Sequence, residues 1–409
     1  MRISTASSQK FRVPLASSGL EPEDIDAVIE TLQSNALTMG ERVREFETLM
    51  ARYLGASHFV MMNSGSSANL AIIESLLRPT DGVPRLQPGD GVLVPAIAWP
   101  TTVWPLVQLG LKPVFVDVDV ESASLDLAAA ERVLSAKNHG IRAVFPIHPL
   151  GRALSPAELD GFCEQHSLIL ISDVCEALGS WRGGVHAGLT SVAASFSFYF
   201  SHHITTMEGG GVATNDDRIA DDLRSIRSHG WSRDRRDANS WPTHGNDVNS
   251  KFLFVSTGFN IRPMEIQAAL GLGQIARIDT YIQARRQIAS RVQRALAGTD
   301  LHLMGSSTLN DDPRSHSWML LPIRAKAAKA AVKAVAFLEK IGVETRPILT
   351  GNFTAQPSLR RILGEELNPE HFTNANLISQ QCFMVGCHHH FTEAQIVHLT
   401  EALSDAAKL

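Results

Sequence analysis

Short apolar runs alternate with amphipathic segments through about the first 270 residues of the chain. Helical spacing of apolar residues covers residues 22–54 and is broken at Gly40. The short apolar runs beyond it have the length and flanking turns of buried strands. The predicted strands are residues 58–63, 91–95, 113–119, 143–148, 168–174 and 194–200, with predicted helices at 66–77 and 101–110.

This alternation predicts an α/β fold with a mostly parallel sheet covered by helices on both faces. From Pro263 a long helical pattern runs towards Leu296. Strands are then predicted near residues 317–323 and 342–349, with a helix between them at 327–341. With 409 residues the chain exceeds one typical domain. We therefore expect a large domain of residues 1–270 and a smaller C-terminal α+β domain of residues 271–409.

Composition narrows the class of protein. A hydrophobic fraction of 44%, a net charge of -5 and a pI near 6.3 are those of an ordinary globular protein. They give no electrostatic reason to expect a nucleic acid or a membrane surface as a partner. The first residues lack the apolar stretch of a signal peptide, and four cysteines are too few for a disulfide framework. A cytoplasmic enzyme is the expectation.

Polar or aromatic residues follow several predicted strands, at the sheet edge where open α/β sheets bind ligands. Ser64-Gly65-Ser66-Ser67 opens a helix and has the small residues that let backbone N–H groups approach a phosphate, although a plain helix cap has the same composition. Trp99 follows the next strand and could stack on a flat ring or simply pack in the core. Asp173 ends a third strand, where it could pair with a protonated ring nitrogen, cap a helix or join a buried salt bridge.

The densest polar stretch follows the last predicted strand of the large domain. Residues 195–211 combine hydroxyls, His202, His203 and Glu208 with three glycines, which we interpret as a flexible turn. Such a cluster rarely serves packing alone, although both histidines could be ordinary loop residues. Further along, Cys382, Cys387 and the three histidines at 388–390 do not have the paired spacing of a structural zinc site, so no metal is predicted.

Six segments in order resemble the DegT/DnrJ/EryC1/StrS family of nucleotide-sugar aminotransferases and dehydratases. They are GSSANL, PAIAWPTT, SDVCEALGS, SFSFYFSHHITTMEGGGVATND, LRSIRSHGWSRD and TGFNIRPMEIQAALGLGQI. The resemblance extends from about Leu37 to FMVGCHHHFTEAQI near the C-terminus. It implies the type I aminotransferase fold and a coenzyme of the vitamin B6 group, pyridoxal 5′-phosphate (PLP) or pyridoxamine 5′-phosphate (PMP).

The resemblance also identifies a change at the residue that aminotransferase members use to bind the coenzyme covalently. Their lysine lies five residues after the serine of the SF motif and six before the glutamate of EGG. Counting from Ser197 and back from Glu208 reaches His202. An imidazole cannot form the imine that a lysine amine forms, so the coenzyme is expected to bind without a covalent link. Members with histidine here are 3-dehydratases of 4-keto-6-deoxy sugars, which this chain also resembles in TRPILTGNFTAQP.

Further roles follow from the resemblance, residue by residue. Trp99 would stack on the coenzyme ring, Asp173 would pair with the ring nitrogen, and His202 would be the catalytic acid and base. Glu176 takes a place that glutamine or histidine often holds, and Ala355 stands where related dehydratases often carry an arginine. The phosphate contacts implied are Ser66, Ser67 and Ser197, with Asn260 reaching the phosphate of a neighbouring protomer in a homodimer with shared active sites.

The implied reaction is removal of the C3 hydroxyl from a nucleotide-linked 4-keto-6-deoxyhexose, with L-glutamate as amino donor. Some histidine-bearing relatives use an iron–sulfur cluster, but Cys163, Cys175, Cys382 and Cys387 fall as two separated pairs, so the cluster-free branch, which acts on GDP-mannose derivatives, fits better. Two alternatives stay open. One is a sugar aminotransferase using Lys251, and the other is a catalytically silent relative that binds a sugar nucleotide.

Overall fold

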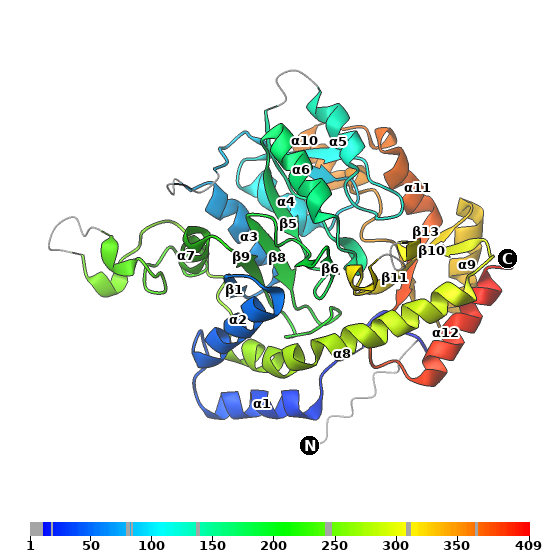
Figure 1. Cartoon of the computed structure of the whole chain (residues 1–409), viewed down its shortest axis with the longest axis horizontal. Coiled ribbons are helices and arrows are strands. Elements are labelled where there is room, and N and C mark those ends of the chain that lie inside the picture. The colour runs from blue at the N-terminus through cyan, green and yellow to red at the C-terminus, as the bar shows by residue number, and fades with distance from the viewer. Residues whose placement is uncertain are drawn as a thin grey trace.

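The computed structural model describes residues 11–409 except for residues 18, 79–81, 83–84, 136–139, 242–247, 308–311 and 365–366. Its centre is a seven-stranded sheet (Figure 1). In spatial order the strands are β1 (His58–Met62), β9 (Gly210–Thr214), β8 (Ala193–Ser197), β5 (Ile169–Asp173), β4 (Ile141–Val144), β2 (Gly91–Pro95) and β3 (Lys112–Val116). The strands from β8 to β3 are parallel, whereas β9 is antiparallel to both β1 and β8. The predicted mostly parallel sheet is confirmed.

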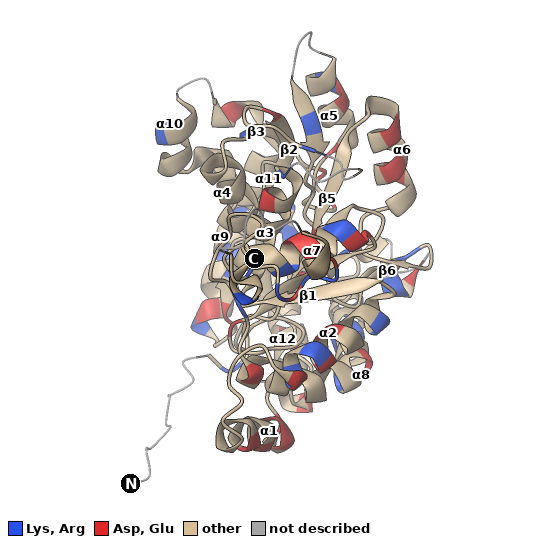
Figure 2. Ribbon diagram, turned by 90° about the vertical axis from the view of Figure 1, so that its left-hand side faces the viewer, with Lys and Arg blue, Asp and Glu red and all other residues tan. Residues whose placement is uncertain are grey.

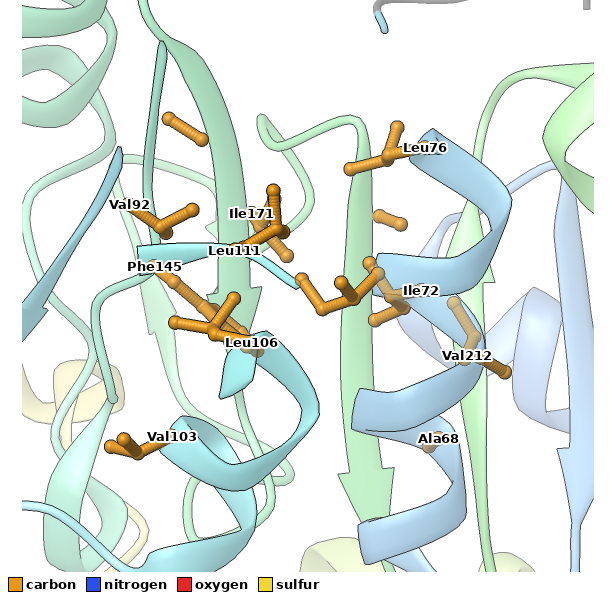
Figure 3. Close-up of a cluster of buried hydrophobic side chains, with 14 of the residues drawn as sticks. Ala68, Ile72, Leu76, Val92, Val103, Leu106, Leu111, Phe145, Ile171 and Val212 are labelled. Carbon is orange, nitrogen blue, oxygen red and sulfur yellow. The ribbon is translucent and has the colours of Figure 1, made fainter. Parts of the chain in front are cut away.

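Helices cover both faces of this sheet, because successive residues of a strand point to opposite faces. In β1, Val60 and Met62 enter one apolar cluster while Phe59 and Met61 enter another. The first cluster is closed by α3 (Gly65–Leu76), α4 (Pro100–Gln108) and α7 (Asp217–Ile226), and Figure 3 shows α3 and α4 contributing side chains to it. The second is closed by α2 (Glu41–Leu54) and α8 (Glu265–Ala295). Helices α5 (Leu127–Leu134) and α6 (Pro156–His166) cover β2 to β5.

A smaller antiparallel sheet follows in the C-terminal part. Its order is β10 (Leu301–Leu303), β11 (Leu320–Ala325), β13 (Cys382–Gly386) and β12 (Thr345–Arg346). Helices α9 (Ala328–Lys340) and α12 (Glu393–Ala406) pack on it. Two further helices, α10 (Pro357–Leu363) and α11 (Thr373–Gln381), and the hairpin β6 (Trp181–Arg182)–β7 (Val185–His186) complete these parts of the chain. The predicted smaller α+β unit is therefore present.

Helix α8 connects the two sheets, running below the large sheet towards the small one in Figure 1, with α1 (Pro22–Gln33) packed against it. Near the N-terminus, Val13 pairs with Val343 and is buried in the cluster of the small sheet. The proposed boundary at residue 270 therefore falls inside a continuous helix, and it stays a prediction.

Two local predictions around residues 194–211 were wrong. The strand predicted over 194–200 ends at Ser197, because from Phe198 onward the chain turns and the Phe198 N–H bonds to the Gly209 carbonyl. Gly210 and Gly211 do not form a turn; they lie in β9. A Cβ on Gly210 would lie 2.4 Å from the Gly65 nitrogen, so this glycine permits close packing of α3 against the strand.

Charged residues of both signs are scattered over the helices visible in Figure 2. None of the helices in the described part of the chain is both long enough and apolar enough to cross a lipid bilayer.

Candidate active site

A cavity of about 390 Å³ opens beside the carboxyl ends of β5 and β8. Ligands of open α/β sheets bind at such edges. Its walls come from both halves of the chain, because Met319, Arg346 and Leu349 belong to the smaller C-terminal part. The lining residues are Ser64, Gly65, Ser66, Trp99, Thr101, Thr102, Ile147, Asp173, Cys175, Glu176, Ser197, Tyr199, Ser201, His202, Glu208, Met319, Arg346 and Leu349.

Most of the residues singled out from the sequence meet in this cavity. Those that line it are Ser66, Trp99, Asp173, Glu176, Ser197 and His202. Ser67 lies one position further into α3, where its N–H donates to the hydroxyl of the cap residue Ser64 at 3.1 Å and its own hydroxyl accepts from Ser64 at 3.0 Å. Asn260 is outside the lining, exposed, and accepts a hydrogen bond from Arg262 at 3.0 Å. Lys251, the alternative lysine, is also outside the lining.

The N-terminus of α3 forms one end of the cavity. Ser64 caps the helix, and the unpaired N–H groups of a first helical turn, together with the helix dipole, favour an anion. Gly65 lies so close to β8 that a Cβ there would be 2.6 Å from the Ser197 Cβ and 3.0 Å from the Cys175 sulfur. Only a glycine keeps Ser66 and Ser197 this near to each other without displacement. This end of the cavity suits a phosphate.

Trp99 forms another wall. It is the N-cap residue of α4, follows the β2 strand after a short turn, and remains 45% exposed. The Arg346 guanidinium lies over its ring, 5.9 Å from the ring centroid. Arg346 is the only lysine or arginine among the described lining residues, and it forms no ion pair with a residue that the structure describes. The cavity therefore contains one flat apolar surface and one available cation.

Asp173 closes the floor of the cavity at the end of β5. It is only 4% exposed and forms no ion pair within the described part of the chain. Its carboxylate accepts hydrogen bonds from Asn69 and Thr102 and from the Cys175 N–H. A buried carboxylate is unfavourable unless a cation or several donors compensate its charge. A cationic group bound in the cavity would complete this compensation.

His202 lies in the loop that joins β8 to β9, and this loop is held firmly. Gln274 of α8 bonds to both backbone groups of Thr205, accepting from its N–H at 2.8 Å and donating to its carbonyl at 2.7 Å. The Thr206 N–H bonds to the Phe198 carbonyl at 2.9 Å, and the His202 N–H bonds to the Tyr199 carbonyl at 2.9 Å. The imidazole is thus presented to the cavity by a fixed backbone, as an acid or base requires.

The surroundings drive the proton affinities of His202 and Glu176 in opposite directions. Burial, with the positive charges of Arg285 and Arg346, lowers the pKa of His202 to about 4. Burial raises the pKa of Glu176 to about 7, with a smaller contribution from the Asp173 charge and partial opposition from the Leu150 N–H. That N–H donates to Glu176 at 2.8 Å. Near neutral pH the cavity therefore holds a neutral imidazole beside a carboxyl that can gain or lose a proton.

These features fit a planar, phosphate-bearing pyridine coenzyme. Phosphate would bind at the α3 N-terminus, the ring would lie against Trp99, and a protonated ring nitrogen would face Asp173. His202 would lie near the reactive end of the ring, and there is no lysine among the described lining residues. The expected roles of all these residues towards the coenzyme stay predictions, as do those of Ser67, Glu176 and Asn260.

Several lining residues were not found from the sequence. Arg346 lay inside a segment noted only for its resemblance, while Tyr199 and Met319 lay inside the strands predicted at 194–200 and 317–323 and were given no role. Thr102 and Asn69 were inside quoted motifs, but nothing in their spacing showed that both would reach Asp173. The signal for all of them is spatial: α4 reaches the cavity by packing on the large sheet, and β12 reaches it only once the small sheet has packed against the large one.

The cysteine and histidine tract near the C-terminus has packing partners of its own. The Cys387 thiol donates to the Arg285 carbonyl at 3.6 Å, and His388 bonds to Ser17 at 2.9 Å. His389 stacks on Tyr281, with ring centroids 3.7 Å apart. This tract packs against the N-terminal segment and α8.

Comparison with known proteins gives a consistent picture. The model of the DegT/DnrJ/EryC1/StrS aminotransferase family matches residues 19–404. A GDP-4-keto-6-deoxy-D-mannose 3-dehydratase of Yersinia pseudotuberculosis is 32% identical, covering 95% of this chain and 98% of its own. A dTDP-4-dehydro-2,6-dideoxy-D-glucose 3-dehydratase of Saccharopolyspora spinosa is also 32% identical, covering 96% of this chain and 86% of its own.

Solved structures agree. The GDP-4-keto-6-deoxy-D-mannose 3-dehydratase of E. coli, with bound hydrated PLP, superposes with a TM-score of 0.84 at 31% identity, covering 96% of this chain and 99% of that one. A structure of GDP-4-keto-6-deoxymannose 3-dehydratase with a trapped PLP-glutamate geminal diamine has a TM-score of 0.83 at 31% identity, covering 96% of this chain and 100% of that one. The predicted fold type and family resemblance are confirmed.

Proposed function

Because the chain belongs to the DegT/DnrJ/EryC1/StrS aminotransferase family, and carries His202 where other members carry a lysine, we propose that it is a sugar 3-dehydratase. It removes the C3 hydroxyl of a nucleotide-linked 4-keto-6-deoxyhexose, with PMP as working coenzyme and L-glutamate as amino donor. The observation that carries this proposal is a neutral imidazole, not an amine, held in a cavity that otherwise suits the coenzyme. The relatives named as 3-dehydratases support it.

When bound, the coenzyme supplies an amine that condenses with the C4 ketone and a ring that accepts electrons. Ser66 and Ser197 would hold its phosphate, Trp99 would cover one ring face, and Asp173 would pair with the protonated ring nitrogen. His202 would accept a proton from the C4′ carbon and deliver it to the C3 hydroxyl, which would leave as water. With a pKa of about 4 in the free cavity, His202 is unprotonated at neutral pH and ready to accept that proton.

Arg346 and Glu176 serve the amino-donor half of the cycle. As the single cation of the described lining, Arg346 would bind a carboxylate of glutamate. Glu176 lies within reach of the charges of both Asp173 and Arg346, and its pKa of about 7 lets it hold or release a proton near neutrality. The trapped PLP-glutamate complex of the related dehydratase supports glutamate as the donor.

We propose GDP as the nucleotide and a homodimer as the active unit. GDP sugars are the substrates in the names of several similar dehydratases, although the relative from Saccharopolyspora is named for a dTDP sugar.

The dimer is supported by two exposed aromatic residues on the segment that leads to Asn260: Phe252 is 61% exposed and Phe254 is 52% exposed. Large exposed apolar groups that gather on one segment mark association surfaces.

Two measurements test the reaction type. Borohydride reduction of the holoenzyme should leave all coenzyme removable by dialysis, because no lysine lines the described cavity. Covalent labelling at Lys251 would instead support the aminotransferase alternative.

A His202→Asn variant should still bind PMP, but its rate of C3 deoxygenation should fall by at least a hundredfold, the usual effect of removing an acid–base group. Full retention of activity would exclude His202 as that group.

A further inference from the structure

Asp173 accepts hydrogen bonds from two side chains, Asn69 and Thr102, that take no part in the proposed reaction steps. Both donate to the same carboxylate oxygen, Oδ2: Asn69 Nδ2 at 2.9 Å and Thr102 Oγ1 at 2.7 Å. The other oxygen, Oδ1, accepts the Cys175 N–H at 3.1 Å. Asn69 and Thr102 are themselves fully buried. The carboxylate is therefore fixed from the side away from bulk solvent.

The two donors come from two helices, α3 and α4, whose N-termini form part of the proposed coenzyme site. Asn69 lies in α3, whose first turn forms the proposed phosphate end of the cavity, and Thr102 lies in the first turn of α4, three residues after Trp99. The orientation of the Asn69 amide is determined by its neighbours. Its Nδ2 also donates to the Thr101 carbonyl at 3.1 Å, and both of its partners can only accept. Turning the amide over would set its oxygen against two acceptors.

We propose that Asn69 and Thr102 are positioning residues that hold the Asp173 carboxylate aimed at the ring nitrogen of the coenzyme. Two donors on one carboxylate oxygen restrict the rotation of that carboxylate. The rest of the carboxylate's hydrogen-bonding capacity is then directed to the cavity, where a protonated ring nitrogen can pair with it. This inference rests on the proposed coenzyme but is independent of which sugar is the substrate.

A purely structural role is the competing explanation, since the same bonds tie α3 and α4 to the end of β5. The two roles differ in their dependence on the ring nitrogen. A positioning residue acts on the coenzyme through Asp173, so its loss matters only when the bound ring has a nitrogen. A structural residue affects the cavity whatever ring is bound.

The test compares two ligands on the coenzyme-free protein, PLP and its 1-deaza analogue, in which a carbon replaces the ring nitrogen. Binding is followed by quenching of tryptophan fluorescence. Thr102→Val, which removes the hydroxyl at nearly constant volume, should weaken PLP binding about tenfold, the size expected for one hydrogen bond to a charged group. Affinity for the deaza analogue should change less than about twofold. Thr102→Ser, which retains the hydroxyl, should restore PLP binding.

If Thr102→Val loses the same affinity for PLP and for the deaza analogue, the role of Thr102 is structural and the proposal is overturned. If its affinity for PLP is unchanged, the proposal is also overturned. Ser75→Ala removes another buried hydroxyl of α3, one that bonds to the Ile72 carbonyl, and serves as the control for general effects on the helix. If Thr102→Val fails to fold, Asn69→Ser is measured with the same ligand pair and the same criteria. Failure of the unaltered protein to bind PLP would count against the proposed function instead.

Discussion

His202 and Glu176 show how a single cavity can hold a base and an acid near neutral pH. One group is a histidine whose pKa is lowered to about 4, and the other a carboxyl whose pKa is raised to about 7. Burial is the main cause of both shifts, because it disfavours whichever form is charged. Pairs of groups whose proton affinities are driven apart in this way are typical of acid–base sites.

The raised pKa of Glu176 predicts a pH-dependent cost in stability. The folded chain holds the Glu176 proton more tightly than the unfolded chain, whose carboxyl titrates near 4.5. The contribution of Glu176 to the free energy of unfolding is therefore fully present below pH 4.5 and is lost as pH rises through about 7. Measured by urea unfolding and compared with Glu176→Gln, the free energy of unfolding of the coenzyme-free protein should fall by about 1–3 kcal/mol across this pH range. A constant difference between the two proteins from pH 4.5 to 7.5 would contradict the assignment.

At the scale of elements, the site depends on two helix N-termini, those of α3 and α4, that meet at the end of β5. Helix α3 contributes the phosphate end and Asn69, while α4 contributes Trp99 and Thr102. The close approach of α3 to β8 depends on Gly65, since any Cβ there would meet Ser197 and Cys175.

A Gly65→Ala variant should therefore bind PLP at least tenfold more weakly, because the added methyl displaces the helix N-terminus from Ser197. Equilibrium dialysis of the coenzyme-free protein measures the affinity. Gly161→Ala in α6 is the matched control, because a Cβ at Gly161 meets nothing within 4 Å. Its PLP affinity should equal that of the unaltered protein. An unchanged affinity in Gly65→Ala would show that the phosphate does not bind at this helix end.

Elements with strong periodicity could be predicted from the sequence, and connections fixed by tertiary packing could not. The strands ending at Pro95 and Asp173, and the long helix α8, were evident from apolar runs and helical spacing. The β9 strand was missed because Gly210 and Gly211 have no side chains to show alternation, and they are glycines only because α3 and Phe59 pack against them. Arg346 was missed for a related reason, since β12 reaches the cavity only through the packing of the small sheet against the large one.

For the whole molecule, the exposed aromatic residues point to a partner surface. Phe252 and Phe254 both stack on Trp231, with centroid distances of 5.7 Å and 6.2 Å, yet remain more than half exposed. The same segment leads into Asn260, the residue that the family resemblance assigns to a neighbouring protomer's phosphate. A shared site would explain why Asn260 is outside the cavity of its own chain.

Replacing both Phe252 and Phe254 by serine should convert the proposed dimer to a monomer, because the apolar area proposed to drive association is removed. Sedimentation equilibrium measures the change, and PLP affinity should fall with it if Asn260 acts across the interface. Val332→Ser in α9 is the control: Val332 is 68% exposed but isolated from this aromatic group, so the dimer should persist. A double variant that stays dimeric would place the interface elsewhere.

The most direct test of the central claim is the mass of the sugar product. The unaltered protein, with PLP and L-glutamate, is incubated with GDP-4-keto-6-deoxymannose, and the nucleotide sugar is analysed by mass spectrometry. A dehydratase predicts a product that lacks one oxygen atom and carries no added nitrogen, with one 2-oxoglutarate and one ammonia formed per turnover. A product that keeps its C3 oxygen and carries an amine at C4 would contradict the account.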